Sequence, residues 1–118
     1  MKIPAIRLTP DGALAEVELE ASASGDHLHS MYREIGCDLV ECVGLREDLD
    51  LWIDEEGKLK DGWEVNLAAT ALLQRHGIHD LVAATALLTG GADEDGNTLG
   101  ISDQTAGEVR RLLGGGKW

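Results

Sequence analysis

Residues 48–57 read DLDLWIDEEG, and their alternation decides how the fold is interpreted. Side chains on an extended strand point alternately to its two faces. One face of this stretch carries only apolar side chains: Leu49, Leu51 and Ile53. The other face carries acids and a tryptophan: Asp48, Asp50, Trp52 and Asp54. The pattern predicts a strand over Asp48–Asp54 whose apolar face lies in the core.

A second stretch of the same kind lies nearer the N-terminus, over Ala15–Ala21. Val17 and Leu19 are predicted to face the core there, and they alternate with an outward acidic row: Glu16, Glu18 and Glu20. Outward side chains on one strand are about 6.6 to 6.8 Å apart, so such a row is regularly spaced. It either keeps a small protein soluble or forms a contact surface that imitates a nucleic-acid backbone. An outward Trp52 favours contact, unless a helix of the same domain covers it.

The other elements follow from hydrophobic periodicity and from capping and turn residues. We expect further strands over Ile3–Leu8, Leu39–Leu45 and Leu81–Thr89, the last of them central because it is apolar on both faces. We expect helices from Ser24 or Asp26 to Ile35, over Asn66–His76, and from Ser102 or Asp103 to Leu113.

The order β-β-α-β-β-α-β-α predicts the α+β class, with a mainly antiparallel sheet of about five strands and three helices on one side of it. We expect a single domain over residues 1–113, because the length is close to that of one domain. Residues 114–118 are expected to form a Gly-rich tail.

The excess of acidic side chains restricts the classes of molecule that the protein can bind. The chain has 118 residues, with 22 acidic and 10 basic side chains and a net charge of −12. Free nucleic acid and anionic membrane surfaces are poor partners for such a surface, whereas a basic protein would be steered toward it. The chain has no secretory signal pattern, and no apolar run reaches the roughly 18 residues of a membrane span. With Cys37 and Cys42 expected as reduced thiols, we expect a cytosolic protein.

Motifs for metals and catalysis are weak in this sequence. The turn Asp54–Gly57 is either an acid–base or metal site or, as we expect, a turn in which Gly57 has positive φ. Residues 93–97, DEDGN, resemble the start of a calcium loop, but the glycine is misplaced and Gln104 stands where the bidentate Glu belongs. The zinc-type ligands lack paired spacing: His27, His29, Cys37 and Cys42. We therefore expect no metal, no cofactor and no catalytic residue.

A set of short motifs in the last two-thirds of the chain resembles the family known as domain of unknown function 3846. They are Asp54–Leu59 after an apolar strand, Asn66–Thr70 opening a helix, Asp80–Val82, Gly90 with Asp93–Gly96, and Ser102–Asp103. The family's turn has Asn where this chain has Asp54, and both residues suit a turn. The resemblance implies no activity and no catalytic residue. It implies a setting, since these proteins are encoded mainly by bacteriophages and mobile elements.

These observations favour a small, phage-encoded accessory protein that has no enzymatic activity and binds a host protein through an acidic face. The host protein is expected to handle nucleic acid or to act in defence. Two alternatives remain open: a structural domain that forms homo-oligomers, and a small enzyme of nucleotide metabolism. The second requires a deep pocket with convergent titratable groups.

Overall fold

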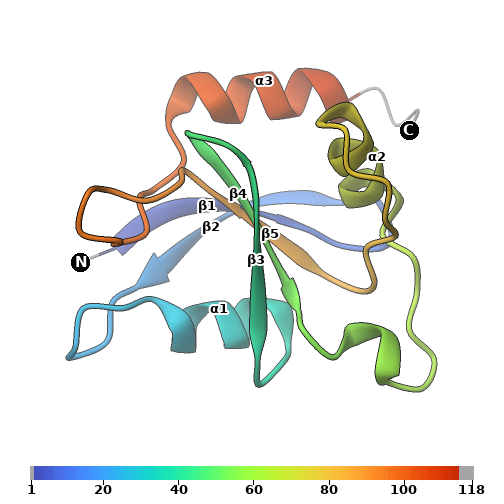
Figure 1. Cartoon of the computed structure of the whole chain (residues 1–118), viewed down its shortest axis with the longest axis horizontal. Helices are drawn as coiled ribbons and strands as arrows, with labels where there is room; N and C mark the ends of the chain where they lie inside the picture. Colours follow the sequence, from blue (N-terminus) through green and yellow to red (C-terminus); the bar gives the residue numbers. More distant parts are fainter. Residues whose placement is uncertain (1, 115–118) are drawn as a thin grey trace.

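The computed structural model describes residues 2–114, which form an α+β fold as predicted (Figure 1). The strands are β1 (Lys2–Leu8), β2 (Leu14–Glu20), β3 (Val40–Arg46), β4 (Leu49–Asp54) and β5 (Ala86–Thr89). The helices are α1 (Leu28–Ile35), α2 (Leu67–Arg75) and α3 (Asp103–Leu113), with a short 3-10 helix η1 (Gly57–Leu59). Residues 115–118 of the expected tail lie outside the described residues.

The strands form one antiparallel sheet in the order β2-β1-β5-β4-β3. Two hairpins, β1–β2 and β3–β4, flank the short strand β5. In this register Leu88 of β5 lies between Ile6 of β1 and Leu51 of β4. All four residues of β5 are buried, which confirms the prediction of a central strand covered on both faces.

The helices lie on both faces of the sheet, so the prediction of helices on one side is wrong. Figure 1 shows α1 below the sheet and α2 and α3 above it. The apolar side chains accordingly form two clusters. The α2–α3 core includes Leu8, Leu49, Leu51, Leu72, Leu88 and Val109. The α1 core includes Ile3, Leu19, Met31, Ile35 and Leu87.

The predicted core residues are divided between these two cores. Leu49 and Leu51 are buried in the α2–α3 core, and a half-buried Ile53 packs against it. Leu19 is buried in the α1 core, where a half-buried Val17 packs against it. Alternation within a strand identified the apolar side chains, but it could not show that two strands present theirs to opposite faces.

Residues 81–85 do not continue strand β5, although their apolar character predicted it. Ala84 has φ of 63°, a left-handed conformation that an L-residue adopts at a cost and that ends an extended run. The side-chain amide of the fully buried Asn66 donates to the Ala84 carbonyl at 2.9 Å and to the Leu8 carbonyl at 3.0 Å. Asn66 thus fixes the segment to β1 and to the start of α2.

Capping explains most helix boundaries. Ser102 accepts from the backbone N–H of Thr105, which confirms it as the N-cap of α3. Asn66 was predicted as the first residue of its helix and is instead the N-cap of α2, where it accepts from the N–H of Ala69. Helix α1 begins later than predicted, at Leu28, because Asp26 closes a hydrogen-bonded turn with Ser22. Gly57 has no positive φ, contrary to prediction; it begins η1 and lies against Ala83.

Candidate functional site

The acids of β4 do not form one exposed row. Asp54 is buried, and its carboxylate accepts from the backbone N–H of Glu56 at 2.9 Å and from Lys60 Nζ at 2.6 Å. Trp52 is half-buried against the α1 core and donates its indole N–H to Thr89 Oγ1 at 2.8 Å. Trp52 therefore lies on the face of β4 opposite to Leu51, as predicted, but this face packs against α1 instead of facing solvent.

The two remaining acids of the row are in contrasting environments. Asp48 precedes β4 and accepts from the Thr105 hydroxyl at 2.8 Å and from the Arg46 guanidinium at 2.6 Å, contacts that hold the pKa of its carboxyl below the usual value. Asp50 is half-buried, and its loss of hydration raises its pKa. Cys42 lies beside it, and desolvation together with the Asp50 charge raises the pKa of that thiol to about 11.

The row on β2 is exposed as predicted. Glu16 forms an ion pair with Arg110 of α3, and Glu20 lies 3.8 Å from Lys2 Nζ. Within residues 2–114, Glu18 has no ion-pair partner. Because β2 is an edge strand, these carboxylates also mark one border of the sheet.

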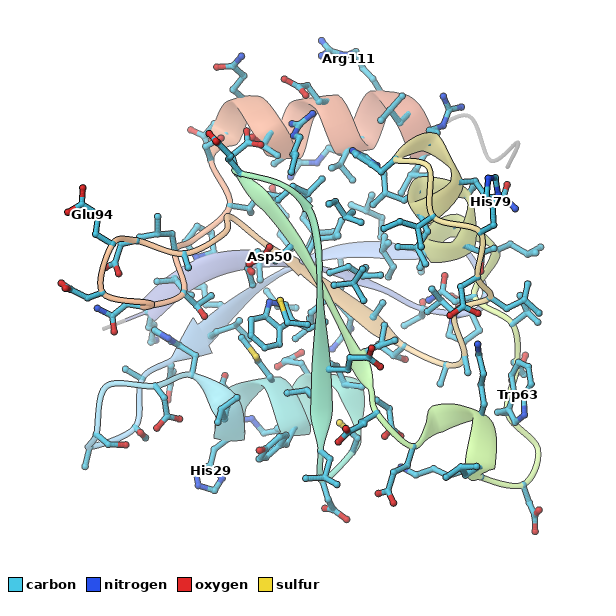
Figure 2. The ribbon with its side chains drawn as sticks, in the orientation of Figure 1. His29, Asp50, Trp63, His79, Glu94 and Arg111 are labelled. Carbon is cyan, nitrogen blue, oxygen red and sulfur yellow. The ribbon has the colours of Figure 1, made fainter. Side chains whose placement is uncertain are left out.

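A groove of about 490 Å³ lies between β2 and α3, beside the α2–α3 core. Its apolar lining consists of the exposed Pro4 of β1 together with the buried Ile6 of β1 and Ile101 before α3. Its β2 side carries Glu16 and Glu18, and its α3 side carries three residues spaced about one turn apart: Asp103, Ala106 and Arg110. Figure 2 shows that the next residue, Arg111, points away from the sheet, so only one of the adjacent arginines lines the groove.

The groove combines negative charge with an apolar floor. Three carboxylates face one guanidinium, so the lining has a net charge of −2. The ion pair between Arg110 and Glu16 shows that a guanidinium reaches the carboxylates of β2. Such a surface can hold a cationic side chain whose aliphatic part lies on apolar atoms.

The described residues offer little to a metal or to a nucleophile. No group of three or more His, Cys, Asp and Glu side chains between residues 2 and 114 is placed to hold a metal ion. The Asp93 carboxylate instead accepts from the backbone of Asp95 and Asn97 within its own loop. His29 and Cys37 line one open depression, but burial and the Asp54 charge raise the pKa of the Cys37 thiol, which disfavours a thiolate.

The family model described as domain of unknown function (DUF3846) matches residues 1–114. The chain belongs to this family. The match covers both hairpins and all three helices, and so extends beyond the motifs in the last two-thirds of the chain. No curated protein and no solved structure matches the chain. Within the part of this family member that the structure describes, no helix is long and apolar enough to cross a membrane.

The sequence pattern of this family member predicted the acids on one side of the groove but not the residues on the other side. Glu16 and Glu18 were predicted from their alternation in β2. Asp103 and Arg110 were not, because α3 follows β2 by more than eighty residues and only the fold brings them together. The available signal was the spacing of Asp103, Ala106 and Arg110, which places them on one face of a helix.

Proposed function

We propose that this protein is a non-enzymatic binding protein that captures a basic segment of a partner protein in the groove between β2 and α3. The observation that carries the proposal is the lining of this groove, where carboxylates from β2 and α3 flank an apolar floor. A cationic side chain would lay its methylene groups on the exposed Pro4 and place its charge between Glu18 and Asp103.

Arg110 of the chain itself already makes the kind of contact that we propose for a partner cation. Its guanidinium already forms an ion pair with the Glu16 carboxylate, while Glu18 has no cationic partner among residues 2–114. The side chains of Glu16 and Arg110 are 73% and 42% exposed, so solvent screens the pair and a partner cation can compete with Arg110. Glu18 and Asp103 would provide the charge-assisted hydrogen bonds of the complex.

The net charge of −12 supports the same class of partner over longer distances. It accelerates encounters with basic surfaces and disfavours direct binding to free nucleic acid. The β2 row retains the regular spacing expected of a nucleic-acid mimic, so a host protein that handles nucleic acid, or one that acts in defence, would suit the groove. The setting that we propose, a phage accessory protein in the bacterial cytoplasm, depends on the family resemblance.

The experiment uses a ten-residue peptide of alternating arginine and alanine, with a citrulline version as its neutral control. Binding is measured by stopped-flow and by calorimetry over a series of salt concentrations. The double variant Glu18→Gln with Asp103→Asn should bind the arginine peptide about tenfold more weakly, since each lost charge-assisted hydrogen bond is significant. Its association rate should also depend less on salt.

A matched control removes the same number of charges elsewhere. Glu94 and Asp61 are exposed residues outside the groove, and Figure 2 shows Glu94 pointing outward from its loop. The double variant Glu94→Gln with Asp61→Asn has the same net charge as the groove variant. If both variants weaken binding equally, or if the citrulline peptide binds as well as the arginine peptide, the groove is not the binding site.

A second candidate function, homo-oligomerisation, is favoured by the other edge of the sheet. Strand β3 is an edge strand without a continuous acidic row, and Val40, Val43 and Leu45 on it are only half-buried. Free edges of this kind pair with another strand unless charge prevents it. A dimer mass in sedimentation equilibrium that is lost on replacing Val43 with Lys would favour this function.

A further inference from the structure

A second cavity, of about 280 Å³, lies on the α1 face of the sheet, away from the groove. Two loops form its walls: the loop between β2 and α1, and the Gly-rich loop between β5 and α3. Figure 1 shows both loops at the same end of the molecule, on the left. Its lining includes His27, Met31, Trp52 and Asn97.

His27 is the most informative of them. The residue is 6% exposed, and its Nε2 atom is buried without a hydrogen-bond partner among residues 2–114. A buried polar atom without a partner destabilises the folded state, and native structures retain few of them. His27 lines the cavity, so a ligand that turns its ring toward the opening would supply the missing hydrogen bond.

Trp52 provides a fixed aromatic surface at the same cavity. Its indole N–H donates to Thr89, which is fully buried, so the orientation of the ring is held from within the sheet. Trp52 is half-buried and lines the cavity together with the buried Met31. An aromatic ring at a cavity favours a flat, unsaturated ligand.

The Gly-rich loop is held at its base and presents polar groups at its tip. Gly91 has φ of 95°, and an added Cβ would lie 2.3 Å from the Glu47 carbonyl, so only glycine permits this approach to the β3–β4 turn. At the tip, the Asn97 side-chain amide donates to Asp93 at 3.2 Å. This bond orients the amide and leaves its oxygen as an acceptor for a ligand.

The charges around the cavity exclude anionic ligands. None of the residues that line it is Lys or Arg. Its one carboxylate, Asp26, already accepts from Ser22, Ser24 and the backbone N–H of Leu28. A phosphate or carboxylate would therefore meet negative charge and no cation. The volume is just below the range of about 300 to 1,000 Å³ typical of drug-sized ligands, so the occupant is small.

We propose that this cavity binds a neutral planar heterocycle of nucleobase type, stacked on Trp52 and hydrogen-bonded by His27 Nε2 and the Asn97 side chain. The same base could be presented by a free nucleoside or by a single-stranded nucleic acid. The net charge of −12 disfavours the second source, and the experiment separates the two. This binding is independent of the groove, whose lining shares no residue with the cavity.

The test is an NMR titration of ¹⁵N-labelled protein with adenosine, guanosine, cytidine and uridine. We expect at least one nucleoside to cause saturable shifts of His27 Nε2 and of the Trp52 indole N–H. The exposed residues His79 and Trp63, which Figure 2 shows far from α1, should not shift. The corresponding monophosphate and a ten-nucleotide single strand should bind more weakly than the nucleoside. If either binds more tightly, the proposal of a neutral ligand is overturned.

The variant Asn97→Ala tests the contact without disturbing the core, because Asn97 is exposed. It should weaken binding of the responding nucleoside about tenfold, the effect of one hydrogen bond to a small ligand. Leu99→Ala, on the same loop but outside the cavity, is the matched control and should leave the affinity unchanged. The proposal is overturned if no nucleoside gives saturable shifts at His27, or if Asn97→Ala binds as tightly as the parent protein.

Discussion

The two faces of the sheet differ in the polar groups beside their apolar cores. The α2–α3 core is an apolar cluster that includes the completely buried Leu51, Leu72 and Leu88. The buried polar side chains at its helices bond to nearby backbone or side-chain groups: Asn66, Thr70 and Thr105. The α1 face adds polar groups to its apolar core. There Arg7 pairs with Glu34 of α1 at 2.6 Å, Trp52 donates to Thr89, and the Asp50 carboxyl is partly desolvated. The α2–α3 face carries the groove beside its core, and the α1 face carries the smaller cavity beside His27.

The lengths of the helices explain this difference. Helices α2 and α3 have 9 and 11 residues and together cover one face, whereas α1 has only 8. At 1.5 Å per residue, α1 is about 12 Å long and cannot cover the other face alone. The uncovered part can therefore hold polar side chains and the cavity beside His27.

The largest expected effect compares one leucine from each face. Leu51 and Leu87 are both 0% exposed, but Leu51 belongs to the α2–α3 core and Leu87 to the α1 core. Leu51→Ala should lower the free energy of unfolding by about 3 to 5 kcal/mol, and Leu87→Ala by about 2 to 3 kcal/mol, because the less covered face can relax around the cavity. Urea denaturation measures both. Equal losses would show that the two faces are equally well packed.

The next largest effect is expected at Asn66, the buried N-cap that connects α2 to β1 and to residue 84. Asn66→Ala removes the N-cap of α2 and leaves the Leu8 and Ala84 carbonyls without their side-chain donor. We expect a loss of about 2 to 4 kcal/mol. Ser102→Ala removes the exposed cap of α3 and should cost about 1 kcal/mol. If the two variants are equally stable in denaturation, Asn66 acts as a cap alone and does not tie β1 to residue 84.

Local patterns predicted the elements of this fold, and tertiary contacts determined what the sequence could not show. The period of two in β2 and β4 and the capping residues Asn66 and Ser102 act over a few neighbouring residues, so the strands and most helix starts were predictable. The face covered by α1 depends on packing between distant segments. For this reason the sequence left open whether a helix covers Trp52, and the structure shows Trp52 packed against the α1 core and bonded to Thr89.

The same distinction applies to the candidate site. Glu16 and Glu18 were predicted because alternation alone places them outward. The burial of Asp54 was not predicted, because it requires Lys60, which η1 brings back to the strand. Sequence alternation identified the acids, and only the fold separated those that remain available to a partner from those with internal contacts.

The smallest expected effects come from two neighbouring acids, Asp48 and Asp50, whose pKa values are shifted in opposite directions. The Thr105 hydroxyl and Arg46 lower the pKa of Asp48, so its charged form stabilises the fold above the unfolded pKa of about 3.9, and this stabilisation is lost as the pH falls. Desolvation raises the pKa of Asp50. Its ionisation therefore destabilises the fold as the pH rises above about 3.9, and below that value the penalty disappears.

The two asparagine variants should therefore change stability in opposite directions at neutral pH. Asp48→Asn removes a favourable charge and should be less stable than the parent protein, whereas Asp50→Asn removes a desolvated charge and should be more stable. Both differences should be smaller than those above, because solvent screens these carboxylates. The difference for Asp50→Asn should vanish as the pH falls below about 3.9, whereas that for Asp48→Asn should fade only as the pH falls through the lowered pKa of folded Asp48. Melting temperatures from pH 3 to 7 test this, since for Asp50→Asn a difference that persists at pH 3 must arise from packing and not from charge.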